Sequence, residues 1–231
     1  MILLATATRW ESGPLAEALS LSPSGAGKAG GMDLTLVETG IGPENARRSL
    51  EGLDLPARTP LSAVLSVGLC GALQPGMFPG DLVLEARGAP ESWLEPARLR
   101  AKDLGLRLHM GTVISLDRVA FDPAQTRMLG ESRRAAAVDM ETVSIRSWAR
   151  ARGAQFAAAR VVLDGVDDRM PDAAPEDGSL RSLAGYLLGR PMDIPLLLRL
   201  GLRQRSAMRG LARFLRSWLE SVARHETESA A

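Results

Sequence analysis

Three carboxylates stand where a predicted strand ends or a helix begins, and their type suits acid–base chemistry. Glu11 follows the apolar run 2–7, Glu141 precedes a helix, and Asp164 ends the strand predicted over 156–163. Because ligands of α/β sheets bind at the carboxyl ends of the strands, we expect the three to converge on one crevice. One carboxyl could then deliver a proton while another activates a nucleophile. Surface salt bridging is the alternative for each of them alone.

Asp164 is the candidate proton donor. It follows the apolar residues 161–163, and burial in apolar surroundings favours the neutral form of a carboxyl group. Asp167 and Asp168 lie farther into the following loop, and we expect both to be solvated.

A glycine-rich segment at the end of another predicted strand lets backbone approach a ligand closely. It reads Gly68-Leu69-Cys70-Gly71-Ala72, and Leu69, Cys70 and Gly71 are therefore candidate binding positions. Close helix–strand packing would explain the glycines equally well. Cys70 itself is expected to be a small buried hydrophobe, because neither histidine of the chain lies in a motif that would activate a thiol.

A second pair of glycines, in Gly40-Ile41-Gly42, follows one predicted strand and precedes a helix that Pro43 suits at its first turn. The third glycine of a dinucleotide-binding fingerprint is replaced by Asn45, and no acidic residue follows at the usual distance. The segment therefore predicts a tight strand-to-helix turn.

The elements that must position these residues alternate between strand and helix. Buried strands are expected over 2–7, 34–37, 63–67, 81–84 and 156–163, with one more within 109–116; helices are expected over 14–19, after Pro43 and from Glu141 to about Arg152; 22–31 reads as a loop. This order predicts one domain over 1–231, a three-layer αβα fold with a central, largely parallel (mixed) twisted sheet.

Composition excludes several classes of function. Of 231 residues, 28 are basic and 27 acidic, so the charge is too balanced for nucleic-acid binding through bulk electrostatics. One cysteine and two histidines exclude a disulfide framework and a cysteine/histidine zinc site, and we expect no metal or cofactor. No basic leader precedes the first apolar run, and no apolar stretch approaches the ~20 residues of a membrane span. We expect a cytoplasmic protein.

The motifs together resemble the nucleoside phosphorylase/nucleosidase superfamily, which includes purine nucleoside phosphorylases, methylthioadenosine/adenosylhomocysteine nucleosidases and futalosine hydrolase. The matching segments lie between residues 2 and 168, and their order and spacing carry the resemblance: Ala7-Thr-Arg-Trp-Glu11, Thr39-Gly-Ile-Gly42, Ser66-Val-Gly-Leu-Cys-Gly-Ala72, Pro79-Gly-Asp81, Val138-Asp-Met-Glu141 and Arg160-Val-Val-Leu-Asp164.

The resemblance implies cleavage of an N-ribosidic bond, with a role for each matched position. Met140 would pack on the sugar, Glu141 would hold the ribose 2′- and 3′-hydroxyls, and Val119 would contact the base. Asp164 would protonate the leaving base, and Glu11 would activate water. A carboxylate near an oxocarbenium-like ribose stabilises its developing charge, while a second acid neutralises the departing nitrogen.

Two departures from the family pattern bear on the mechanism. Ser66 and Leu69 stand where hexameric phosphorylases hold phosphate with arginine and serine, so the anion would lack its strong ligands. Water is therefore the expected nucleophile, and phosphorolysis is the alternative. Leu163 stands where many relatives have a serine beside the acid, so Asp164 loses one orienting hydrogen bond.

The C-terminal segment resembles the tail of hopanoid-biosynthesis-associated nucleoside phosphorylases. The resemblance lies in 189–200 and implies a lipid-linked nucleoside substrate similar to adenosylhopane. Residues 190–224 predict a basic amphipathic helix. Its apolar face consists of Met208, Leu211, Leu215, Trp218 and Val222, and its basic face of Arg205, Arg209, Arg213 and Arg216. The helix could lie on the inner face of a membrane through 196–222. Packing of its apolar face on its own domain or across a dimer is the reading we favour.

Other readings of the activity stay open. The substrate could be methylthioadenosine, adenosylhomocysteine or futalosine, and an inactive nucleoside-binding scaffold is the non-enzymatic alternative. The resemblance also implies a homodimer, because protomers of this family borrow residues from a neighbour. The expected partner is thus a small nucleoside and not a nucleic acid.

Overall fold

The computed structural model describes residues 1–55, 60–86, 89, 91–117, 123–168 and 194–229. Its strands are β1 (Ile2–Thr6), β2 (Ala26–Ala29), β3 (Met32–Glu38), β4 (Ala63–Ala72), β5 (Leu82–Glu85), β6 (Leu108–Met110), β7 (Val113–Ser115), β8 (Ala137–Asp139) and β9 (Gln155–Asp164). Its helices are α1 (Arg9–Ala18), α2 (Pro43–Glu51), α3 (Leu94–Asp103), α4 (Pro123–Arg133), α5 (Thr142–Ala151) and α7 (Ile194–Ser229), with a 3₁₀ turn, η1, at Glu91–Trp93.

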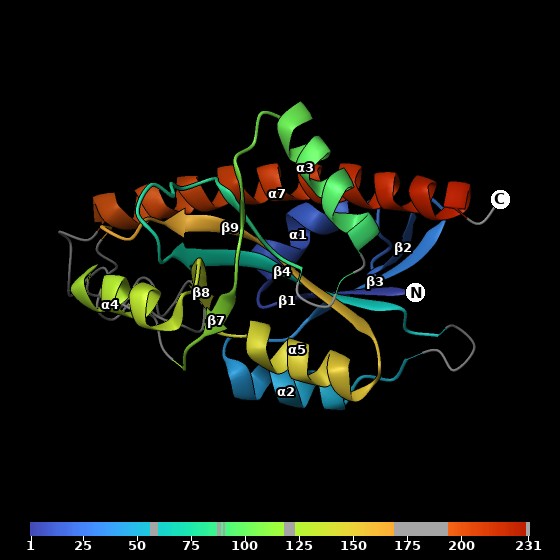
Figure 1. Cartoon of the computed structure of the whole chain (residues 1–231). Coiled ribbons are helices and arrows are strands. Elements are labelled where there is room, and N and C mark those ends of the chain that lie inside the picture. The colour runs from blue at the N-terminus through green and yellow to red at the C-terminus, as the bar shows by residue number, and fades with distance from the viewer. Residues whose placement is uncertain (56–59, 87–88, 90, 118–122, 169–193, 230–231) are drawn as a thin grey trace.

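These elements form the three-layer α/β fold with a mixed, mostly parallel sheet that the sequence predicts. The strand order is β2-β3-β1-β4-β9-β5-β6, and β8 pairs with β4 and β7 outside this path. Strands β3, β1, β4 and β9 are parallel neighbours, whereas β2, β5 and β8 run antiparallel to β3, β9 and β4. Figure 1 shows α7 lying along one face of the sheet with α1 and α3, and α2 with α5 on the other.

Strand β4 is the centre of the sheet and the branch point where it divides. Along most of its length β4 pairs with β1 and β9, but its last residues, Gly71 and Ala72, also pair with β8. The register between β4 and β9 shifts between Cys70 and Gly71. Such irregularities bend a strand and re-aim its neighbours' side chains, and they are frequent beside active sites.

Three local expectations are wrong. The segment 22–31 contains the short strand β2, which pairs along β3. The first helix begins at Arg9, so Glu11 lies inside its first turn. The region 109–116 holds the predicted strand as β7 but also the end of a second strand, β6, with Gly111 and Thr112 between them.

Helix α7 supplies much of the apolar core on its side of the sheet. Its predicted apolar face is fully buried, and Trp218 stacks on Phe214 with ring centroids 5.6 Å apart. The Trp218 indole N–H donates to the Trp93 carbonyl at 2.9 Å, so its polar atom is satisfied. The apolar face therefore packs on its own domain, as favoured, and Trp218 and Phe214 lie in the core rather than on the surface. None of the described helices has the length and apolar character of a membrane span.

We predict a strong contrast between two leucines of α7. Leu215 is fully buried and Leu202 is 68% exposed. Leu215→Ala should lower the unfolding free energy by about 2–5 kcal/mol through lost burial and a residual cavity. Leu202→Ala should change it by less than about 0.5 kcal/mol. Urea unfolding of both variants measures this, and similar losses would contradict the packing of α7 on the sheet.

Candidate active site

Glu11 binds the backbone of two different elements with its two carboxylate oxygens. It occupies the third position of α1, so its side chain reaches back to the start of the helix. Oε2 accepts hydrogen bonds from the Ala7 and Thr8 amides at 3.0 and 2.9 Å and from the Thr8 hydroxyl at 3.2 Å. Oε1 accepts only from the Leu69 amide of β4, at 2.8 Å. The helix start thus fixes the carboxylate against β4.

Glycine at position 68 makes this approach possible. A Cβ at Gly68 would overlap the Glu11 carboxylate and would lie 2.7 Å from Nη1 of Arg160. Any side chain there would push the two charged groups away from the strand. The glycines of β4 therefore let charged side chains of the protein approach the strand closely, and contact of this segment with a ligand stays a prediction.

Glu141 is the N-cap of α5 and is only 4% exposed. Its Oε1 accepts the Gly42 amide at 2.8 Å, so the glycine turn before α2 holds it in place. Burial, together with the charges of Asp139 and Glu11, raises the pKa of Glu141 to about 7 against the opposing charge of Arg160. The carboxyl groups of Glu11 and Glu141 are therefore close enough to interact.

Asp164 ends β9 opposite Gly71 of β4, just past the register shift. A Cβ on Gly71 would lie 3.0 Å from Oδ2 of Asp164, so this carboxyl also lies against β4. Burial, as the preceding apolar residues predict, and the charge of Asp168 together raise its pKa to about 7 against the opposing charge of Arg203. Glu11 and Asp164 thus lie at one end of the same strand, within residues 68–71.

The expectation that Asp168 is solvated is wrong, because its carboxylate is bound by two groups of the protein. Its Oδ2 accepts the Gly165 amide at 3.0 Å and pairs with Arg203 of α7 at 2.8 Å. These contacts lower the pKa of Asp168, so its negative charge persists beside Asp164. Asp167 is exposed as expected and pairs with Arg127.

The other predicted site residues that the structure describes lie at or beside the carboxyl end of β4. Cys70 is buried, and burial raises the pKa of its thiol well above the usual range, consistent with a small hydrophobe. Leu69 and Gly71 are partly buried on β4, and Met140 is partly buried between β8 and α5. Val119 lies outside the described residues.

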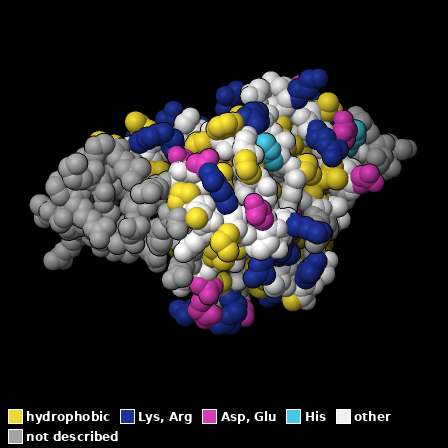
Figure 2. Space-filling view, turned by 60° about the vertical axis from the view of Figure 1, so that its left-hand side comes forward, with side chains coloured by type: hydrophobic (Ala, Val, Ile, Leu, Met, Phe, Trp, Pro, Cys, Tyr) yellow, Lys and Arg dark blue, Asp and Glu magenta, His cyan; other side chains and the backbone are white. Residues whose placement is uncertain are grey.

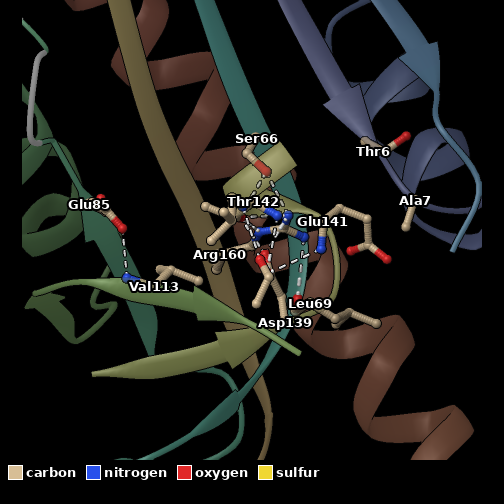
Figure 3. A network of polar contacts seen from close by, with 12 residues as sticks. Thr6, Ala7, Ser66, Leu69, Glu85, Val113, Asp139, Glu141, Thr142 and Arg160 are labelled. Atoms are coloured by element: carbon tan, nitrogen blue, oxygen red, sulfur yellow. Dashed lines mark hydrogen bonds and ion pairs between the residues drawn. The ribbon is translucent and has the colours of Figure 1, made fainter. Parts of the chain in front are cut away.

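A buried ion pair that the sequence reasoning missed lies at the centre of this cluster. Arg160 of β9 and Asp139 of β8 are paired at 2.7 Å, and their side chains are 1% and 2% exposed. The guanidinium also donates to Ser66 at 2.6 Å and to Thr142 at 2.9 Å, and Thr142 donates in turn to Asp139 (Figure 3). The pair therefore ties β4, β8, β9 and α5 together.

A signal for this pair was present in the sequence. Arg160 is the only charged residue in the run 156–163, and a charge inside a buried strand requires a partner of opposite sign. The partner, Asp139, lies 21 residues earlier in the chain, and strand pairing brings it to Arg160.

Carboxyl groups gather around one arginine at the carboxyl ends of parallel strands, which is where α/β proteins bind ligands. The family model of the phosphorylase superfamily matches residues 25–87 and 85–181, which include Glu141 and Asp164 but not Glu11. The chain belongs to the phosphorylase superfamily, which confirms the resemblance, and it is an enzyme of the nucleoside phosphorylase/nucleosidase type. A search of curated proteins gave no match.

Solved structures with the same fold extend over nearly the whole chain. A futalosine hydrolase of Helicobacter pylori has 17% identity and a TM-score of 0.67, covering 94% of this chain and 96% of that one. The methylthioadenosine/adenosylhomocysteine nucleosidases of Campylobacter jejuni and S. pneumoniae have 19% and 16% identity and TM-scores of 0.68 and 0.70. Each covers 95% of this chain and 98% of the other. At such identities the likeness shows the fold.

We predict that the buried Asp164 carboxyl destabilises the protein in alkali. Its pKa is about 7 in the folded state against 3.8 ordinarily, so its favourable contribution is present in acid and is lost as the pH rises through 7. Asp164→Asn cannot ionise, and its stability relative to the wild type should rise by up to about 4 kcal/mol between pH about 4 and about 8. Chemical unfolding across this pH range measures the difference.

Asp33→Asn is the matched control. Asp33 is exposed, and its hydrogen bond to Lys28 lowers its pKa, so this variant should lose stability above the ordinary pKa. The same pH trend in both variants would mean that Asp164 is not desolvated.

Proposed function

We propose that this enzyme hydrolyses the N-ribosidic bond of a modified purine nucleoside, with Asp164 as general acid and Glu11 as general base. The observation that carries the proposal is the position of both carboxyl groups at one end of β4, within residues 68–71. The names of the structural neighbours, futalosine hydrolase and methylthioadenosine/adenosylhomocysteine nucleosidase, agree with this class of reaction.

Asp164 has the protonation state that a general acid needs. With a pKa of about 7 it still carries its proton in much of the population at neutral pH. It can therefore donate that proton to the purine nitrogen as the glycosidic bond breaks. The neighbouring charge of Asp168, held by Arg203, keeps this proton in place.

Glu11 offers one oxygen to a nucleophile. Oε2 already accepts three hydrogen bonds, whereas Oε1 accepts one and keeps a lone pair for a water molecule. A proton passing from that water to Oε1 would leave hydroxide to attack the anomeric carbon. Glu11 would thus activate water on one side of the ribose while Asp164 protonates the leaving base, as the two carboxyl groups do in inverting glycosidases.

Glu141 and Met140 would hold the sugar between these groups. Gly42 fixes Oε1 of Glu141 and leaves Oε2 for the ribose 2′- and 3′-hydroxyls. The negative charges around Glu141 stabilise an oxocarbenium-like ribose. Met140 offers an apolar surface beside the ring.

The contacts of Glu11 argue for water rather than phosphate. The backbone amides of Ala7, Thr8 and Leu69 could bind an anion, but the Glu11 carboxylate occupies them. The buried cation nearby, Arg160, is neutralised by Asp139. Near Glu11, the residues that the structure describes would thus offer a phosphate dianion a carboxylate and a guanidinium that is already paired.

For the substrate we propose an adenosine carrying a large apolar 5′ group, similar to adenosylhopane, with adenine as the product. Support comes from the resemblance of 189–200 and from two exposed leucines, Leu198 and Leu202, on α7 near Arg203, which reaches Asp168. A homodimer remains part of the proposal.

A substrate panel tests both halves of this proposal. We expect adenine release from adenosylhopane to be faster than release from adenosine, methylthioadenosine or futalosine, and to proceed equally without phosphate. Base release followed by chromatography, with and without phosphate, is the measurement. Strict phosphate dependence would overturn hydrolysis, and turnover of methylthioadenosine or futalosine alone would overturn the lipid-linked substrate.

We predict that the two catalytic carboxyls differ in their pH profiles. Glu11→Gln and Asp164→Asn should each lower kcat/KM by about 10²–10⁴-fold, because each removes a proton-transfer group. The wild-type kcat/KM should fall as the pH rises above about 7, where Asp164 ionises, and Asp164→Asn should lack this fall. Asp167→Asn, an exposed neighbour, is the control and should keep the wild-type profile. Near-native rates in the first two variants would refute the site.

A further inference from the structure

The outer face of α7 carries a charge pattern that neither the core nor the site uses. Residues 194–225 contain seven arginines and one glutamate, although the whole chain is nearly neutral. Arg205, Arg209 and Arg213 are exposed at successive four-residue steps, so they form one stripe opposite the buried face. None of the three makes an ion pair with any described residue.

This stripe is unfavourable for the helix itself. Like charges four residues apart repel each other along a helix surface. The neighbouring arginines differ, because Arg203 pairs with Asp168 and Arg216 with Glu220. The repulsion within the stripe would be relieved by an anionic surface that binds all three side chains.

The N-terminal end of the same outer face is apolar. Leu198 and Leu202 are one helical turn apart, are 65% and 68% exposed, and precede the stripe at similar angular positions on the helix. A polyanion such as a nucleic acid would bind the arginines but would provide no apolar surface for the two leucines. A flat surface with anionic headgroups above an apolar layer matches both kinds of side chain.

We propose that the outer face of α7 binds an anionic lipid bilayer, with Arg205, Arg209 and Arg213 at the headgroups and Leu198 and Leu202 in the boundary below them. Figure 1 shows α7 as a long, straight helix along one side of the molecule, and the space-filling view in Figure 2 shows basic and hydrophobic side chains interspersed on the surface that faces the viewer. The docking helix stays folded on its own domain, and the proposal holds whichever nucleoside the enzyme takes.

Vesicle co-sedimentation of the full chain tests this binding. We expect binding to phosphatidylcholine vesicles that contain phosphatidylglycerol, weak binding to phosphatidylcholine alone, and release at high salt. The triple variant Arg205→Gln, Arg209→Gln, Arg213→Gln should bind anionic vesicles roughly 100-fold more weakly. Leu198→Ser with Leu202→Ser should weaken binding about tenfold.

The matched control removes the same charge elsewhere. Arg48→Gln, Arg98→Gln, Arg133→Gln changes three exposed arginines on α2, α3 and α4 and should keep most of the vesicle binding. An equal loss in this control would overturn the proposal in favour of bulk charge. Absence of binding to anionic vesicles at low salt would also overturn it.

A duplex DNA of random sequence distinguishes a lipid surface from a polyanion. The wild type should bind it more weakly than anionic vesicles, and the leucine variant should bind it as the wild type does. DNA binding as tight as vesicle binding, together with no effect of the leucine variant on vesicles, would identify a polyanion surface and refute the proposal.

Discussion

The buried pair between Arg160 and Asp139 is the interaction on which the rest of the site depends. Burial of two charges is costly, and only close pairing and full hydrogen bonding offset that cost. Arg160 meets this condition through Asp139, Ser66 and Thr142, which come from β8, β4 and the start of α5. These elements meet only where β4 pairs with both β8 and β9. The ion pair therefore also stabilises this branch point of the sheet.

The same pair sets the electrostatics of the carboxyl groups around it. Arg160 lowers the pKa of Glu141, while burial and the charges of Asp139 and Glu11 raise it, and the balance lies at about 7. With Asp139 already neutralising Arg160, little positive charge remains for another anion. Acidic side chains therefore surround the Arg160 guanidinium, and the proposed preference for water over phosphate depends on this arrangement rather than on a single residue.

Local patterns in the sequence were sufficient to predict the layers, most strands and the three carboxyl groups. Hydrophobic runs mark β1, β4 and β9, and the polar residues that follow them mark the sheet edge. What the sequence alone could not supply are contacts between distant segments. Asp168 appears solvated until Arg203, on a helix far along the chain, pairs with it, and β2 lacks the apolar run that identifies a strand. The buried arginine was visible, but its partner depended on strand register.

Glu11 and Asp164 are both carboxyl groups on one strand end, and their surroundings separate their roles. Glu11 lies in the first turn of α1 and accepts four hydrogen bonds, three of them from backbone amides. Asp164 lies where burial and the charge of Asp168 both favour its neutral form. A reaction that needs a base on one side of the sugar and an acid on the other requires this difference. At the end of β4, backbone donors surround the Glu11 carboxylate, and the negative charge of Asp168 lies beside Asp164.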